Sequence, residues 1–180
     1  MKKMVTLHGR NFQRMISQED IQQRVGELGS VLRMRYEGKI PLFIGILNGA
    51  FVFAADLLRA YGEDCEIQFV RLSSYEGTSS TGKINTLIGL ESEKIEGRDI
   101  IIVEDIVDSG RTLSEFISTL QQHKPASVIV ATCFLKPEAL AFDVKPELVG
   151  FSIPNKFIVG YGLDYDGLGR NLPAVYQLAE

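Results

Sequence analysis

The chain has 180 residues, 45% of them hydrophobic and 23% charged, which predicts one soluble domain with its own core over residues 1–180. A formal net charge of -4 offers no general attraction for nucleic acid or an anionic membrane, so neither is an expected partner. The two cysteines lie far apart and the N-terminus lacks the apolar core of a signal peptide, so we expect a reduced, cytoplasmic protein without disulfides, bound zinc or membrane spans.

Residues 1–72 predict two helices and two strands. Ser17 and Asp20 resemble a capping box, in which two side chains three residues apart cap the first turn of a helix. Apolar residues then recur at helical spacing, whereas the next apolar run is short and ends at an Asn48-Gly49 turn. The predicted elements are helices over 17–37 and 50–61 and strands over 41–47 and 66–72.

From residue 73 onward, a polar loop is followed by further strands and one helix. The stretch 73–83 is rich in Ser, Thr and Gly, and we predict a mobile loop there, while 100–103 has the pattern of a strand buried on both faces. Apolar residues after Gly110 predict a helix that ends before Pro125. The other predicted strands are 85–90, 128–135, 148–153 and 157–159. Strands alternating with helices predict an α/β fold with a parallel twisted sheet flanked by helices.

A turn that suits a phosphate group follows the strand at 100–103. It consists of Asp108, Ser109, Gly110, Arg111 and Thr112. Small residues and glycine let backbone N–H groups converge on an anion, the next helix adds its positive end, and two hydroxyls supply further donors. The alternative is that Asp or Ser simply caps the helix, and the five residues alone do not decide between the two.

Two consecutive carboxylates, Glu104 and Asp105, precede this turn. We expect them at the end of the strand, where both side chains can reach one ligand, on the sheet edge where α/β proteins bind ligands. Adjacent carboxylates suit the vicinal hydroxyls of a sugar or a magnesium-bound polyol, and a solvated acidic turn is the alternative. Together with the phosphate-type turn, they indicate a sugar phosphate ligand.

The stretch 100–113 resembles the phosphoribosyl-pyrophosphate motif of the type I phosphoribosyltransferases, most closely that of the hypoxanthine-guanine branch. Other motifs of that branch recur in order and spacing over about residues 41–172. They are Leu47-Asn48-Gly49, Ser74-Tyr75, Lys136, Phe157-Ile158, the run 159–165 and Arg170. The resemblance implies a parallel α/β core, a small hood made of the N-terminal and late C-terminal segments, and a homodimer or homotetramer.

The resemblance also implies a purine salvage reaction, the transfer of a phosphoribosyl group from phosphoribosyl pyrophosphate to hypoxanthine and guanine. By analogy, Asp108 would exchange a proton with purine N7. Lys136 would donate to the 6-oxo group, which favours these purines over adenine. Phe157 would stack on the purine, and the main chain of Ile158 would line its far edge.

For the sugar substrate, the resemblance places the 5-phosphate at the turn 108–112 and the ribose hydroxyls at Glu104 and Asp105. Other residues would contact the pyrophosphate or close over it to exclude water: Asn48, Gly49, Arg170, Ser74 and Tyr75. Asn48 stands where relatives often carry a basic residue, so the backbone of that turn is expected to do the binding.

Magnesium is the implied cofactor, because it prefers oxygen ligands and usually arrives with substrate phosphates. By the resemblance, Asp164 would anchor a second magnesium ion through water. Glu104 and Asp105 would act on the metal only indirectly, through the ribose hydroxyls.

Two other classes of protein share parts of this pattern. A regulatory RNA-binding protein can use the same scaffold, but the acidic charge and the presence of Asp108, Lys136 and Arg170 argue against it. A phospho-accepting receiver domain also has acids after a strand, magnesium and a Lys136-Pro137 pair, but it needs neither the phosphate-type turn nor the long polar loop.

Overall fold

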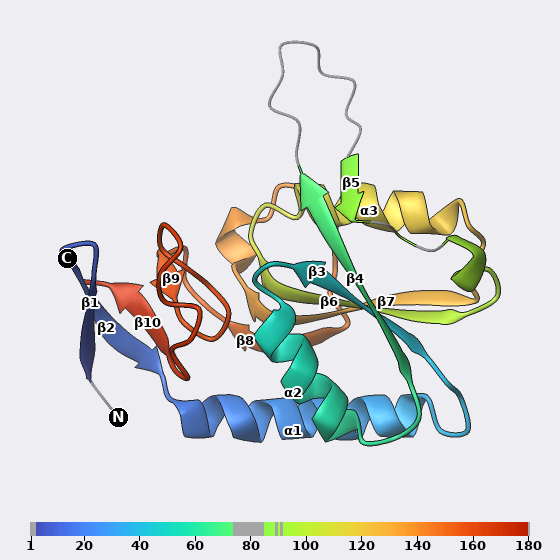
Figure 1. Ribbon diagram of the computed structural model, residues 1–180, viewed down its shortest axis with the longest axis horizontal. Coiled ribbons are helices and arrows are strands. Elements are labelled where there is room, and N and C mark those ends of the chain that lie inside the picture. Colours follow the sequence, from blue (N-terminus) through green and yellow to red (C-terminus); the bar gives the residue numbers. More distant parts are fainter. Residues whose placement is uncertain (1–2, 74–84, 89, 91, 180) are drawn as a thin grey trace, which may run out of the picture.

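The computed structural model describes residues 3–73, 85–88, 90 and 92–179, which form two β-sheets (Figure 1). In these residues the larger sheet has six strands, in the spatial order β5 (Asn85–Ile88), β4 (Glu66–Ser73), β3 (Leu42–Leu47), β6 (Asp99–Val107), β7 (Ser127–Leu135) and β8 (Leu148–Ser152). Neighbouring strands are parallel, except that β5 runs antiparallel to β4. The predicted parallel sheet is confirmed.

Helices cover both faces of this sheet (Figure 1). The described helices are α1 (Gln18–Arg35), α2 (Phe51–Tyr61), α3 (Arg111–Gln121) and the short 3-10 turns η1 (Ser92–Lys94) and η2 (Pro137–Ala139). Ile101 and Val103 of β6 pack with side chains of α1 and α2, whereas Ile100 and Ile102 pack with those of α3. A strand buried on both faces is therefore apolar at consecutive positions. None of the described helices has the length and apolar character needed to cross a lipid bilayer.

The chain reverses its direction of sheet growth between β3 and β6. From β3 it adds β4 on one side, and the later strands β6, β7 and β8 on the other side. The connections that leave β3 and β6 therefore diverge to opposite faces, which opens a crevice at the carboxyl ends of these strands. This crevice is where the sequence places its acidic and phosphate-type motifs.

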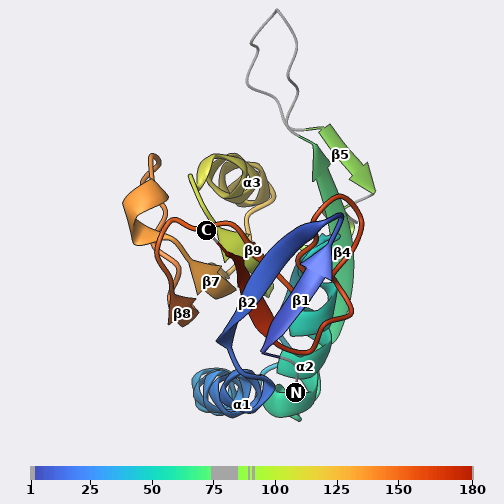
Figure 2. The same cartoon turned by 90° about the vertical axis from the view of Figure 1, so that its left-hand side faces the viewer.

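A second sheet forms the hood beside the larger one (Figures 1 and 2). Its described strands, in spatial order, are β1 (Met4–Leu7), β2 (Arg10–Ile16), β10 (Val175–Leu178) and β9 (Ile158–Val159). They pair antiparallel, so the two ends of the chain meet in one sheet, and Phe12, Val159 and Tyr176 belong to its small core. The expected hood is confirmed, although the sequence did not predict β1, β2 or β10 as strands.

The expectation that Glu104 and Asp105 lie at the very end of the strand, where both side chains can reach one ligand, is wrong. β6 continues to Val107 and stays paired with β7 as far as the partners Val107 and Leu135, although its pairing with β3 ends at Val103. The two carboxylates therefore lie inside a strand that extends beyond its neighbour. Because side chains alternate along a strand, they point to opposite faces.

A capping box fixes the first turn of α1, and one glycine lets the helix pack closely against α2. The Ser17 hydroxyl accepts from the N–H of Asp20 at 3.1 Å, and the Asp20 carboxylate accepts from the N–H of Ser17 at 3.4 Å, so the predicted capping box is confirmed. At Gly29, an added Cβ would lie 2.6 Å from the carbonyl carbon of Ala60 in α2. The absence of a side chain at Gly29 lets the two helices pack closely.

Arg24 of α1 contacts the outer edge of the sheet. Its Nε donates to the carbonyl oxygen of Gly150 at 3.0 Å, and its Nη2 donates to that of Val149 at 2.9 Å. Both acceptors belong to β8, the last strand of the sheet. A side chain of α1 thus occupies two carbonyl groups of an edge strand.

Candidate active site

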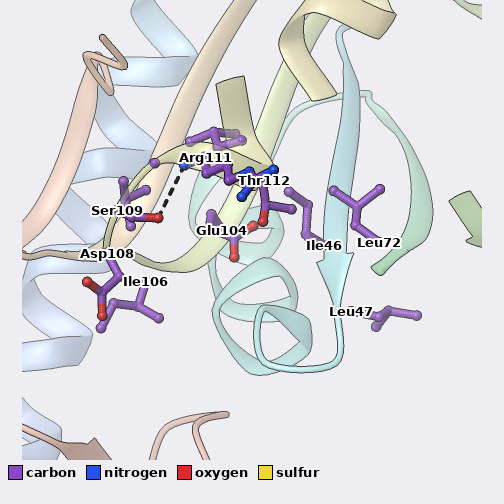
Figure 3. Close-up of a pocket in the computed structure, with 12 residues that line it drawn as sticks. Ile46, Leu47, Leu72, Glu104, Ile106, Asp108, Ser109, Arg111 and Thr112 are labelled. Carbon is purple, nitrogen blue, oxygen red and sulfur yellow. Dashed lines mark hydrogen bonds between the residues drawn. The ribbon is translucent and has the colours of Figure 1, made fainter. Parts of the chain in front are cut away.

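A cavity of about 280 Å³ opens at the carboxyl ends of β3 and β6 (Figure 3). It is lined by Ile46, Leu47, Leu72, Glu104, Ile106, Val107, Asp108, Ser109, Gly110, Arg111, Thr112 and Leu113. Apolar side chains of β3 and β4 form one wall, and the turn after β6 forms the other. The structure thereby brings Glu104 and all five residues of the predicted phosphate-type turn to one cavity.

The turn presents the start of α3 to this cavity. Gly110 is the N-cap residue with φ +80°, a left-handed conformation that favours glycine, and it has no side chain to cap the helix. The Ser109 hydroxyl accepts from the N–H of Arg111 at 3.4 Å (Figure 3). The carbonyl of Ser109 accepts from the N–H groups of Ala141 and Phe142 at 3.0 and 3.2 Å, which holds the turn from behind. A helix start whose N-cap residue has no side chain, on a turn that is held in place, is suited to binding an anion.

The two carboxylates of β6 lie in different surroundings. Glu104 lies beneath Thr112 in the cavity, and its Oε2 is buried without a hydrogen-bond partner among the described residues (Figure 3). Asp105 is 8% exposed, and its Oδ1 accepts from the N–H of Ile106 at 2.8 Å. Burial, and secondly the charge of Asp105, raises the pKa of Glu104 well above its usual range, and burial also raises the pKa of Asp105. An unpartnered buried carboxylate oxygen is suited to accept from a ligand hydroxyl.

Asp105 faces the turn that follows β3. A Cβ at Gly49 would lie 1.4 Å from Oδ2 of Asp105, so no side chain fits between the turn and β6. The peptide bond between Leu47 and Asn48 is cis. On its other side, the turn touches the hood, because a Cβ at Gly162 would lie 2.1 Å from the carbonyl oxygen of Gly49. The Asn48-Gly49 turn is thus packed between Asp105 and the hood loop.

Lys136 and Asp108 form an ion pair at the ends of neighbouring strands. Lys136 Nζ donates to Asp108 Oδ2 at 2.9 Å, and the Lys136 N–H donates to the carbonyl of Val107 at 3.0 Å. Lys136 is 8% exposed, whereas the side chain of Asp108 is 55% exposed. The ammonium group is therefore held in place, and the carboxylate is open to a ligand.

Phe157 and Ile158 begin the return of the chain into the hood. Phe157 is 49% exposed, and its ring packs against Phe12 at 6.3 Å and edge-on against Tyr165 at 5.7 Å between centroids. Ile158 is buried in β9. An exposed aromatic ring supported by two others can stack on a flat ligand.

Asp164 and Arg170 form a second ion pair, in the hood loop. Arg170 Nη2 lies 2.6 Å from Asp164 Oδ1, and Nη1 donates to the carbonyl of Gly162 at 2.7 Å. Asp164 Oδ2 also accepts from the N–H of Gly167 at 2.8 Å. The positive charge of Arg170 opposes the rise that burial causes in the pKa of Asp105.

The structure therefore gathers the predicted residues into adjoining groups. Glu104 and the turn line the cavity, Lys136 meets Asp108, and the Asn48-Gly49 turn contacts both Asp105 and the loop that carries Arg170. Ser74 and Tyr75 lie outside the described residues. The sequence predicted no role for Asp56 of α2, which accepts a hydrogen bond from Tyr161. The signal there is a tyrosine between two glycines, which marks an unusual backbone.

The family model described as the phosphoribosyl transferase domain matches residues 15–166. Since this is most of the chain, the protein belongs to the phosphoribosyltransferase family. The receiver-domain alternative is thereby excluded.

Individual relatives narrow the assignment. The chain is 43% identical over 162 residues to the hypoxanthine-guanine phosphoribosyltransferase of Lactococcus lactis subsp. lactis (strain IL1403), covering 89% of this chain and 87% of that one. It is 44% identical over 167 residues to the enzyme of the same name from Streptococcus thermophilus (strain CNRZ 1066), covering 92% of each. A crystal structure of a hypoxanthine-guanine phosphoribosyltransferase from Bacillus anthracis str. 'Ames Ancestor' matches with a TM-score of 0.87 and 40% identity, covering 93% of this chain and 98% of that one. Within the family, the chain is an enzyme of the hypoxanthine-guanine phosphoribosyltransferase branch.

Proposed function

We propose that this enzyme transfers the 5-phosphoribosyl group of phosphoribosyl pyrophosphate to hypoxanthine and guanine, giving IMP and GMP and releasing pyrophosphate. The names of its relatives support the substrate class. The observation that carries the proposal is the pair of Lys136 and Asp108, a cation and a carboxylate 2.9 Å apart beside an anion-binding turn. A 6-oxopurine that carries its proton on N7 presents O6 as an acceptor and N7–H as a donor on one edge, and the ammonium and the carboxylate can bind one each.

In this proposal the purine takes the place of the contact between Lys136 and Asp108. Lys136 donates to O6, and the 6-amino group of adenine, itself a donor, is rejected. As purine N9 forms its bond to C1 of the sugar, Asp108 accepts the proton that leaves N7. The exposed ring of Phe157 stacks on the purine, and the main chain of Ile158 lines its far edge.

The sugar phosphate binds on the other side of Asp108. The N–H groups of residues 109–112 and the hydroxyls of Ser109 and Thr112 hold the 5-phosphate at the start of α3. The buried, unpartnered Oε2 of Glu104 supports a role in accepting from a ribose hydroxyl, and Asp105 is adjacent to it in the chain. C1 of the sugar then lies between the purine and the departing pyrophosphate.

Magnesium fits these residues as a companion of the substrate. The available donors are carboxylate oxygens, which magnesium prefers, and the described residues contain no group of three or more His, Cys, Asp or Glu side chains that could hold a metal by themselves. Asp164 would hold the ion through water, and Glu104 and Asp105 would act on it through the ribose hydroxyls. When bound, magnesium supplies positive charge to the leaving pyrophosphate.

The backbone of the Asn48-Gly49 turn and the guanidinium of Arg170 would orient the pyrophosphate. Closure of a loop bearing Ser74 and Tyr75 over the site stays a prediction, because those residues are not described. Exclusion of water matters here, since water competes with the purine for the activated sugar.

A substrate panel tests the proposed function. Purified protein with magnesium and phosphoribosyl pyrophosphate is given hypoxanthine, guanine, xanthine or adenine, and nucleotide formation is followed by absorbance. We expect turnover with hypoxanthine and guanine and none with adenine. Absence of nucleotide with all four purines, combined with salt-dependent binding of RNA, would instead support the regulatory RNA-binding alternative.

We also propose a homodimer or homotetramer in the cytoplasm. Phe51, Ile67 and Phe69 are 43%, 38% and 36% exposed on α2 and β4, which supports association of copies through apolar surface. Both cysteines are free thiols, which supports a reducing compartment. Light scattering after size-exclusion chromatography would measure the oligomer, and a single-protomer mass would contradict it.

A further inference from the structure

A tyrosine hydroxyl joins the hood loop to the helix behind the Asn48-Gly49 turn. Tyr161 is 4% exposed, and its Oη donates to Oδ2 of Asp56 at 2.9 Å. Asp56 lies in α2, the helix that begins directly after this turn. Burial raises the pKa of Tyr161 above its usual value, so the hydroxyl stays protonated and remains a donor. The bond therefore connects two segments that are far apart in the sequence.

The backbone around Tyr161 has to be held in place by its surroundings. Gly160, Tyr161 and Gly162 have φ values of +100°, +50° and +99°. Residues with side chains rarely adopt positive φ, and they do so where other contacts fix them. The N–H of Tyr161 donates to the carbonyl of Leu172 at 2.8 Å, and the side-chain bond to Asp56 adds an anchor on the core.

This segment packs against the turn after β3, which in the proposed function binds the sugar substrate. A Cβ at Gly162 would lie 2.1 Å from the carbonyl oxygen of Gly49, and a Cβ at Gly49 would lie 1.4 Å from Oδ2 of Asp105. Gly162, Gly49 and Asp105 are thus packed in a row with no space between them. Movement of the segment at Tyr161 would shift the turn after β3.

We propose that Tyr161 and Asp56 are positioning residues for the pyrophosphate end of the sugar substrate. The inference rests on the proposed function, in which the turn at Gly49 and the guanidinium of Arg170 orient the pyrophosphate. Arg170 donates to the carbonyl of Gly162, the residue next to Tyr161, so both pyrophosphate-binding groups depend on this segment. Neither Tyr161 nor Asp56 touches the substrate, and the purine side of the site is not involved.

The variant Tyr161→Phe removes the hydroxyl and keeps the ring. We expect KM for phosphoribosyl pyrophosphate, and KM for pyrophosphate in the reverse reaction, to rise about three- to tenfold, as for the loss of one hydrogen bond. KM for hypoxanthine should stay unchanged. Calorimetric titration with phosphoribosyl pyrophosphate and magnesium, without purine, should show the same weakening, which separates binding from turnover.

Two further variants distinguish positioning from general stability. Asp56→Asn keeps an oxygen that accepts from the tyrosine, so this variant should bind the sugar substrate with nearly normal affinity. Asp56→Leu removes the acceptor and should behave like Tyr161→Phe. The matched control is Tyr36→Phe, which removes another buried hydroxyl at the end of α1, near the starts of β6 and β7. It should leave every KM unchanged.

The results also separate this inference from the proposed function. Unchanged affinity for phosphoribosyl pyrophosphate and pyrophosphate in an active Tyr161→Phe enzyme would overturn the positioning role. So would a lower melting temperature and kcat with every KM unchanged in both Tyr161→Phe and Asp56→Leu. A wild-type protein that neither binds phosphoribosyl pyrophosphate nor forms nucleotide would reject the proposed function itself.

Discussion

Nζ of Lys136 lies 2.9 Å from Oδ2 of Asp108 because the strands that precede them are paired in register. The last partners of β6 and β7 are Val107 and Leu135, so the next residue of each chain segment emerges side by side at the same edge. Two residues separated by 28 positions thus become a pair through strand register alone. A ligand that binds between them has to compensate for the lost ion pair.

Asp108→Asn should lower kcat by about 10²- to 10⁴-fold, because an amide cannot accept the proton from purine N7. The N–H groups and hydroxyls that hold the phosphate are retained, so the Kd for phosphoribosyl pyrophosphate should change little. Steady-state kinetics and calorimetry measure the two quantities. Unchanged turnover would reject the proton-transfer role of Asp108.

Lys136→Ala should raise KM for hypoxanthine by about tenfold or more, since a charged hydrogen-bond donor to the 6-oxo group is lost. The affinity for phosphoribosyl pyrophosphate should remain close to that of the wild type. Lys39→Ala is the matched control, because it removes an exposed lysine paired with Asp99 at 3.0 Å at the opposite end of β6. Equal losses of affinity for both substrates would show that Lys136 is structural.

Glu104→Gln should make the protein more stable and weaken its binding of the sugar substrate. The folded-state pKa of Glu104 lies well above the unfolded value of 4.5. Its contribution to stability is therefore complete below about pH 4.5 and is lost as the pH rises through the folded pKa. Glutamine does not titrate, so the variant should melt at a higher temperature than the wild type at neutral and alkaline pH, and the difference should shrink as the pH falls toward the unfolded pKa of Glu104.

Thermal denaturation over that pH range checks the prediction for Glu104. A melting difference that does not change with pH would contradict the idea that the buried carboxylate is the cause. Calorimetry with phosphoribosyl pyrophosphate should show weaker binding by the variant. Equal binding by both proteins would argue against contact between Glu104 and the ribose.

Gly29→Ala and Gly26→Ala should change stability in opposite directions. At Gly29 a Cβ would lie 2.6 Å from backbone and side-chain atoms of Ala60, so we expect a loss of about 1–3 kcal/mol from overpacking. At Gly26, in the same helix, a Cβ meets nothing within 4 Å, and alanine should add about 0.5–1 kcal/mol through its helix propensity. Urea unfolding measures the free energy of unfolding of both variants. A Gly29→Ala variant as stable as the wild type would contradict the close contact between α1 and α2.

Local patterns in the sequence are sufficient to predict the central elements of the fold. The capping box at Ser17 and the four consecutive β-branched residues at 100–103 depend on neighbours in the chain, and both are where they were predicted. The turn at 108–112 was recognisable for the same reason, since its glycine and the helix that follows are adjacent in the sequence.

The hood and the orientation of the acids depend on distant partners instead. In β2 only Phe12 and Ile16 are buried, and β10 has only four residues, so neither segment shows a clear strand pattern in the sequence. The two become strands because they pair with each other. Whether Glu104 and Asp105 point the same way depends on how far β6 continues as a strand, and its pairing with β7 extends it to Val107. The link between Tyr161 and Asp56 likewise exists only after the hood meets α2.

The guanidinium of Arg24 has a consequence for how copies of this chain can associate. An open outer strand is a template on which another polypeptide can add a strand and start an aggregate. Here the carbonyls of Val149 and Gly150, in the outer strand β8, already accept from this guanidinium. A neighbouring chain would have to displace the arginine before it could extend the sheet beyond β8, so this border resists edge-to-edge growth.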